Sequence, residues 1–107
     1  MSACDICRRV ADARLLFHSK RLYDDGGIVE LKIWAVPEPV PGSPHGLKYS
    51  LYYGRNGERL VGYDNERGKG DHRHFGGREQ SYSFTGVEQL VADFEADVIR
   101  VRGEANE

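Results

Sequence analysis

The chain has 107 residues, the usual size of one domain, and its 39 % hydrophobic content is enough for a single core. No apolar run approaches the roughly 18 residues that cross a bilayer, and the start MSACDICRRV lacks the apolar segment of a signal peptide, so we expect a cytoplasmic protein with no membrane partner. The net charge of −2 argues against strong non-specific binding to nucleic acid, because such binding comes chiefly from neutralising phosphates.

The charge is unevenly distributed along the chain. Residues 55–78 contain six Lys and Arg and four Asp and Glu, whereas residues 79–107 contain two Lys and Arg and seven Asp and Glu. Any action on nucleic acid should therefore be local to the basic segment or assisted by a partner. The acidic end of the chain is most simply the solvated face of a helix.

Residues 1–12 are interpreted as an amino-terminal extension. A short helix is expected over residues 2–13, because Ile6, Val10 and Ala13 fall on one stripe.

The same segment holds both cysteines of the chain, Cys4 and Cys7, as a single C-x-x-C pair. One pair cannot form a four-cysteine zinc site, and no thioredoxin-like strand and helix flank it. Incidental reduced thiols are the preferred interpretation over a redox or metal role.

Two strands are expected before the prolines. Residues 13–23 contain the apolar clusters LLF and LY and are followed by DDGG, which suits a reversal between strands. Residues 28–36 (IVELKIWAV) then alternate, which puts Val29, Leu31 and Ile33 on one face of a strand. All four prolines lie between residues 37 and 44, so that stretch is an extended connector.

A hairpin is expected next. Residues 47–54 alternate again, and Asn56-Gly57 is the strongest short hairpin signal in the chain. A two-residue turn there predicts four pairs: Arg55 with Glu58, Tyr53 with Leu60, Leu51 with Gly62, and Tyr49 with Asp64.

The chain should end in a short strand and a helix. Residues 81–84 can add the strand, and Thr85 and Glu88 form a capping box at the start of a helix that ends near Gly103. Its apolar stripe consists of Val87, Leu90, Val91, Phe94, Val98 and Val101. We therefore predict one α+β domain over residues 13–103, an antiparallel sheet of four to five strands packed by the carboxy-terminal helix, and a disordered tail at 104–107.

The segment YDNERGKGDHRHFGG, residues 63–77, is the candidate site. Its four glycines permit sharp turns that bring distant side chains together. The acid and imidazole groups considered for catalysis are Asp64, Asp71, His72 and His74. The residues considered for substrate binding are Arg67, Lys69, Arg73 and Tyr63.

Three kinds of chemistry fit this set, and the sequence leaves them open. In metal-free RNA cleavage, His72 and His74 would transfer protons while a carboxylate orients an imidazole and the cations hold the phosphate. In a metal site, an extended H-x-H would put both imidazoles on one side, and Asp64 or Asp71 would complete the ligands. In the third, the segment is a hydrated loop whose charges pair with one another, each pair worth about 0–1 kcal/mol.

Three stretches together carry a family resemblance: VELKIWAVPEPVPGS, KYSLYYGRNGERLVGYDNERGKGDHRH and the helix LVADFEADV. Over residues 13–102 the chain resembles the small TumE-like family of toxins from prokaryotic toxin–antitoxin systems. The most specific element is YDNERGKGDHRH, and Phe75 stands where an aliphatic residue is expected. The matching positions are Tyr63, Asp64, Asn65, Glu66, Gly68, Lys69, Gly70, Asp71, His72 and His74.

The resemblance implies a cytoplasmic toxin of a type II system, paired with a helix-turn-helix antitoxin and acting on RNA or translation, with RNA or the ribosome as a further partner. Whether the chain is an enzyme stays open, with an endoribonuclease as the activity considered. No organic cofactor is expected, and a divalent metal is left open. The alternative is a non-enzymatic binding module, in which the segment docks a partner protein and the acidic helix attracts a basic surface.

Overall fold

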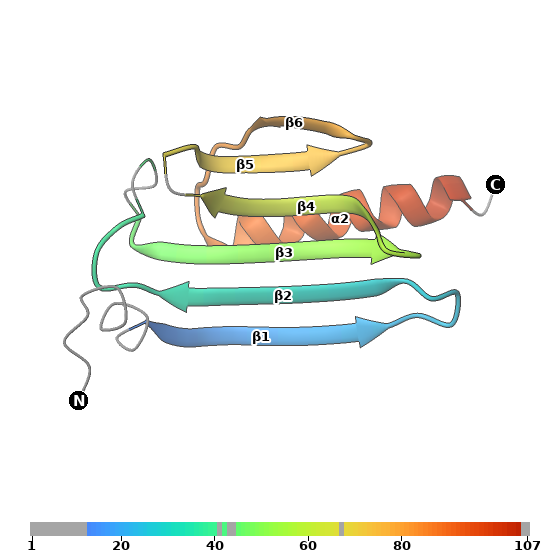
Figure 1. Cartoon of the computed structure of the whole chain (residues 1–107), viewed down its shortest axis with the longest axis horizontal. Helices are drawn as coiled ribbons and strands as arrows, with labels where there is room; N and C mark the ends of the chain where they lie inside the picture. Colours follow the sequence, from blue (N-terminus) through green and yellow to red (C-terminus); the bar gives the residue numbers. More distant parts are fainter. Residues whose placement is uncertain (1–12, 41, 43–44, 67, 106–107) are drawn as a thin grey trace.

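The computed structural model describes residues 13–40, 42, 45–66 and 68–105, which form one antiparallel sheet and one helix (Figure 1). The strands are β1 (Arg14–Leu22), β2 (Ile28–Ala35), β3 (Leu47–Arg55), β4 (Glu58–Glu66), β5 (Gly70–Phe75) and β6 (Arg78–Ser81). The helix is α2 (Val87–Ala105). Each strand pairs with its neighbours in the sequence, in the order β1-β2-β3-β4-β5-β6.

The α+β class is confirmed, but the strand count is corrected from four or five to six. The additional pair is β5 and β6, which lie where we expected a glycine-rich loop. Polar residues occupy both faces of β5, so it lacks the apolar alternation by which a strand is identified from sequence. The strand predicted over residues 81–84 is also corrected, because only Ser81 belongs to β6.

α2 lies across one face of the sheet, behind β3 and β4 in the view of Figure 1. Leu90, Phe94 and Val98 of the predicted stripe are buried against it, whereas Val87 is 39 % exposed. From the sheet, the buried partners are Leu31, Ile33, Tyr49, Leu51, Tyr53, Val61 and Tyr63. The helix continues to Ala105, two residues beyond the predicted end.

The register between β3 and β4 differs from the predicted one by a β-bulge. Arg55 pairs with Glu58 as predicted, but Tyr53 pairs with Val61 because Leu60 is the extra residue of the bulge. A one-residue shift exchanges the two faces of a strand. It moves Tyr63 of β4 into the core, and it moves Asp64 opposite Ser50, onto the face that α2 does not cover.

β2 alternates as predicted, with Leu31 and Ile33 buried. β1 is an edge strand whose residues are all exposed, among them Leu15, Leu16 and Phe17. The helix predicted over residues 2–13 lies outside the described residues, apart from the last of them. Within the described part of the chain, α2 is not apolar enough to traverse a lipid bilayer.

Candidate functional site

The turn between β4 and β5 brings the two ends of the candidate segment together. Gly68 and Gly70 have positive φ of 84° and 75°, a conformation that favours glycine, and the strands then pair antiparallel. Asp64 is consequently the direct cross-strand partner of His72, and Gly62 is that of His74. Most of the candidate segment is therefore a β-hairpin, and cross-strand pairing makes these side chains neighbours.

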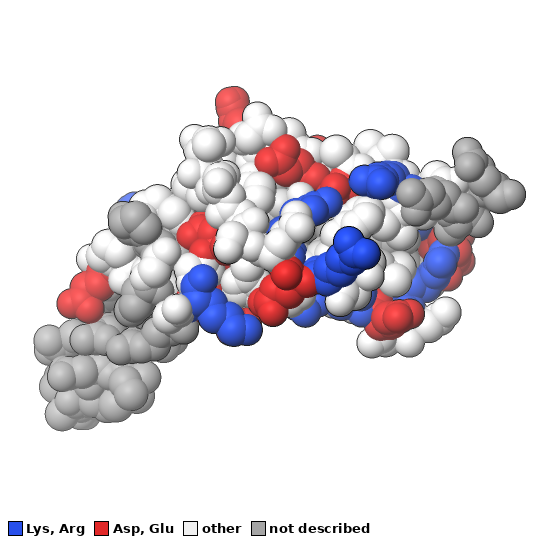
Figure 2. All heavy atoms as spheres, turned by 90° about the horizontal axis from the view of Figure 1, so that it is seen from above, with Lys and Arg blue, Asp and Glu red and all other residues white. Residues whose placement is uncertain are grey.

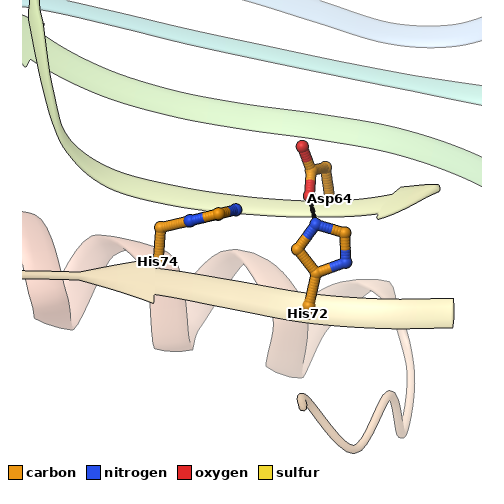
Figure 3. A group of neighbouring side chains, drawn as sticks. All are labelled: Asp64, His72 and His74. Atoms are coloured by element: carbon orange, nitrogen blue, oxygen red, sulfur yellow. Dashed lines mark ion pairs between the residues drawn. The ribbon is translucent and has the colours of Figure 1, made fainter. Parts of the chain in front are cut away.

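Asp64, His72 and His74 converge on the face of the sheet opposite α2 (Figure 3). Oδ1 of Asp64 lies 2.6 Å from Nε2 of His72. The two imidazole rings are 5.2 Å apart between centroids and stand nearly perpendicular, at 76°. One ligand atom from each of the three residues lies within 4.8 Å of the others, a spacing that could hold a metal ion. The H-x-H period therefore places both imidazoles on one side, as extended backbone requires.

His72 is buried, and its ring is fixed by the backbone. Nδ1 lies 3.1 Å from the carbonyl oxygen of Gly70, which can only accept, so Nδ1–H is the donor. Nε2 of His72 and Oδ1 of Asp64 are both buried and have no hydrogen-bond partner of acceptable geometry. The contact between these two atoms is thus short but lacks the alignment of a hydrogen bond.

A second carboxylate, that of Glu79 in β6, lies beside the imidazoles of His72 and His74. Its Oε2 lies 3.3 Å from Nε2 of His72 and 3.5 Å from Nε2 of His74. β6 supplies it because the β5–β6 hairpin pairs His74 with Glu79. Glu66 is more distant, with Oε1 3.8 Å from His72 Nε2. Glu79 therefore adds a carboxylate beside both imidazoles, and Asp64 adds one beside His72.

Two cations border the site. Arg59 Nη2 donates to His74 Nδ1 at 3.0 Å, and Lys69 Nζ lies 3.5 Å from Glu79 Oε2. Partial burial and the Arg59 charge lower the pKa of His74, so its ring is neutral at pH 7. Desolvation opposes ionisation of Glu79, but Lys69 and the two imidazoles lower its pKa overall.

Two of the predicted site residues, Tyr63 and Arg73, lie on the opposite face, under α2, where they meet Asp97. Tyr63 donates from its hydroxyl to Asp97 Oδ2 at 2.6 Å, and Arg73 Nε donates to the same oxygen at 2.8 Å. Arg73 also donates to the Tyr63 hydroxyl at 2.9 Å. The three residues form a closed network between β4, β5 and the helix, so Tyr63 and Arg73 do not join the imidazoles.

Asp71 also lies on the helix side of the sheet. Its Oδ2 accepts from the hydroxyl of Tyr49 at 2.6 Å and lies 2.8 Å from His45 Nε2. The His45 ring packs 4.0 Å, between centroids, from that of Phe84. The His45 ring, which follows the proline connector, is therefore largely buried between aromatic side chains.

Of the remaining predicted residues, Lys69 borders the site and Arg67 lies outside the described residues. Glu79 and Arg59 also reach the site but were not among the residues predicted from sequence. Glu79 follows Gly76-Gly77, a pair typical of a tight hairpin turn, and that turn would have placed it opposite His74. Nothing in the local sequence indicates that Arg59 crosses over Gly62 toward His74, since this depends on the bulge.

The surface around the hairpin carries both signs of charge. Figure 2, which views the molecule from the β6 side, shows Lys and Arg interspersed with Asp and Glu on that face. A long nucleic acid would meet no uniform basic surface there. The chemistry of the site therefore depends on local groups: two imidazoles, the neighbouring carboxylates and the cations of Arg59 and Lys69. Such a set can transfer protons or hold a metal ion.

The family model described as Toxin TumE matches residues 5–102 of the chain. The match begins earlier than the residue-13 boundary predicted from sequence and includes Cys7. Comparison with curated proteins and with solved structures found no match.

Proposed function

The chain belongs to the TumE toxin family, and we propose that its toxic activity is cleavage of RNA at the cluster of Asp64, His72, His74 and Glu79. The observation that carries the proposal is the convergence of two imidazoles and two carboxylates on the open face of the sheet. The partly exposed Arg59 and Lys69 at the rim supply positive charge for a phosphate.

Cleavage would proceed by attack of the ribose 2′-oxygen on the adjacent phosphorus. The 2′-hydroxyl loses its proton to a base, the new P–O2′ bond forms, the P–O5′ bond breaks, and the 5′-oxygen takes up a proton. His74 suits the part of base, because its lowered pKa keeps it neutral at pH 7. Alternatively, the four side chains hold a metal ion that activates the nucleophile.

The partners follow from the same proposal. As a toxin of a type II system, the chain would be inhibited in the cytoplasm by an antitoxin with a helix-turn-helix domain. RNA, free or on the ribosome, would be its substrate.

Induced expression tests the toxic role of the site. We expect the wild-type chain to arrest growth and the His72→Ala/His74→Ala double variant not to. His18→Ala is the matched control, because His18 is an exposed histidine of β1 that pairs with Glu30 at 2.9 Å and lies outside the cluster. Equal arrest by wild type and double variant, with equal amounts of protein, would remove the histidines from the mechanism.

Purified protein tests the reaction itself. Incubation with RNA should yield fragments that the double variant does not produce. Cyclic 2′,3′-phosphate ends would identify the 2′-oxygen as nucleophile, whereas 5′-phosphate ends would indicate attack by water. Absence of fragments from a folded, growth-arresting protein would contradict the proposed reaction.

One observation favours the second candidate, a non-enzymatic binding module. β1 exposes Leu15, Leu16, Phe17 and Leu22 on a sheet edge, and such apolar patches are typical of protein contacts. In this case toxicity would depend on β1 rather than on the imidazoles. Phe17→Ser would then abolish growth arrest, while the double histidine variant would retain it.

A further inference from the structure

We infer that Asp64, His72, His74 and Glu79 together bind one divalent transition-metal ion of the zinc class. A metal ion at this place would deepen the proposed function, and its part in RNA cleavage rests on that proposed function. The binding itself rests on the geometry of the four side chains.

The proton positions of His72 favour a cation beside its ring. Because Nδ1–H donates to the Gly70 carbonyl, the neutral ring presents a lone pair at Nε2. That lone pair faces Asp64 Oδ1 at 2.6 Å and Glu79 Oε2 at 3.3 Å, and both are acceptors. The lone pairs of Nε2 and of Asp64 Oδ1 therefore face each other and repel, because no hydrogen atom lies in line between the two atoms, which lack hydrogen-bond partners. A cation between them removes the conflict.

The same backbone contact is the one that metal-binding histidines use. A ligating imidazole usually donates its second N–H to a carbonyl or carboxylate, which fixes both the tautomer and the ring orientation. His72 meets this condition through Gly70, and the turn glycine is itself fixed by close packing against Gly42.

The distances between Glu79 and the two imidazoles also suit a bound ion. With bonds of about 2.0–2.1 Å, two ligand atoms on a tetrahedral ion lie about 3.3 Å apart. Glu79 Oε2 lies 3.3 Å and 3.5 Å from the two Nε2 atoms, which already fits. The contact of 2.6 Å between Asp64 and His72 is shorter and would widen as the ion enters.

The chemistry of the four side chains indicates the class of metal. Two imidazoles with carboxylates suit zinc, manganese, iron and cobalt rather than magnesium or calcium, which prefer oxygen ligands alone. Two negative carboxylates also neutralise the charge of a divalent ion.

Two contacts must change when the ion binds. Arg59 donates to His74 Nδ1, which must instead carry a proton if Nε2 is to ligate, and Lys69 pairs with Glu79. Both cations are exposed and on long side chains, so they can move toward solvent or a phosphate. We therefore expect Arg59→Gln to strengthen metal binding or leave it unchanged, because it removes a competing charge.

Cobalt titration tests the site. The Cys4→Ser/Cys7→Ser chain serves as the background, because thiolates also bind zinc and cobalt. We expect the visible bands of four-coordinate Co²⁺ at one equivalent, displaced by Zn²⁺. His74→Ala and Glu79→Gln should each weaken binding by more than the roughly 10–100-fold that loss of an outer-shell partner causes. His18→Ala, the matched control, should bind like the background chain.

The outcomes separate the two proposals. A folded background chain that shows no bands, or bands that persist unchanged in both His74→Ala and Glu79→Gln, would overturn the metal site. His72→Ala is a weaker test because the ring is buried and its loss could unfold the chain; the two less buried ligands keep the test decisive. RNA cleavage that survives chelation would support the ribonuclease proposal and show that the reaction does not need the ion. Metal binding without RNA cleavage would support the metal site and contradict the ribonuclease proposal.

Discussion

Asp64 and His72 face each other across the β4–β5 ladder, with Oδ1 and Nε2 only 2.6 Å apart and both atoms buried. Asp64 lies near the end of β4 and His72 near the start of β5, and the short connection between the two strands uses positive φ at Gly68 and Gly70. The relationship is therefore set by one hairpin, and it forms the centre of the proposed site.

Asp64→Asn should abolish most of the RNA cleavage while the chain stays folded. The amide keeps the size of the side chain but loses the charge that either a proton relay or a metal ion requires. A positioned proton-transfer group contributes about 10²–10⁴-fold in rate, and we expect a loss in this range. Asp24→Asn, in the exposed turn after β1, is the control. Rates within twofold of wild type would remove Asp64 from the mechanism.

Gly70→Ala should destabilise the chain more than Gly68→Ala. Both residues have positive φ, which costs an alanine roughly 1–2 kcal/mol. A Cβ at Gly70 would also lie 2.8 Å from the backbone oxygen of Gly42, whereas one at Gly68 would meet nothing within 4 Å. Denaturant unfolding of the two variants measures the difference, which isolates the contact with Gly42. Equal stabilities would show that this contact is readily relieved.

The chain should lose stability above about pH 10, the ordinary tyrosine value. Burial and hydrogen bonds to Asp71, Asp97 and Asp93 raise the pKa of Tyr49, Tyr63 and Tyr82 respectively. Each hydroxyl stays protonated in the folded chain but ionises in the unfolded chain near that pH, so the free energy of unfolding falls as pH rises through it.

Urea unfolding between pH 8 and pH 11 measures this slope. Tyr82→Phe should reduce it, because that variant removes one of the three hydroxyls, the one that donates to Asp93 at 2.6 Å. A free energy that stays level to pH 11 would contradict the assignment.

Phe94 should be the most sensitive position of α2. It is fully buried and packs edge-on to Tyr63, with ring centroids 6.0 Å apart. Phe94→Ala should cost about 3–5 kcal/mol, and Phe94→Asp should prevent folding because it buries a charge. Ile99→Ala is the matched control on the same helix, since Ile99 is 70 % exposed. A loss under 1 kcal/mol for Phe94→Ala would mean that the helix is not packed as described.

Local pattern alone predicted much of this fold. The alternation of Val29, Leu31 and Ile33 predicted a strand with one apolar face, and the spacing of Leu90, Phe94 and Val98 predicted a helix that covers such a face. Both signals arise because buried apolar side chains recur about every two residues in a strand and about every 3.6 residues in a helix, and this spacing is visible in the sequence. The pairing of Arg55 with Glu58 followed from Asn56-Gly57 for a similar reason.

Only the tertiary structure decided which face each polar residue of the site occupies. The bulge at Leu60 shifts β4 by one residue, which sends Tyr63 to the helix and Asp64 to the open face. The polar strands β5 and β6 continue the backbone ladder that begins at β4. In β5, Arg73 points to the helix side and away from the two histidines. β6 then brings Glu79 opposite His74. Charged residues have no burial period of their own, so their placement depends on the register of the strands beside them.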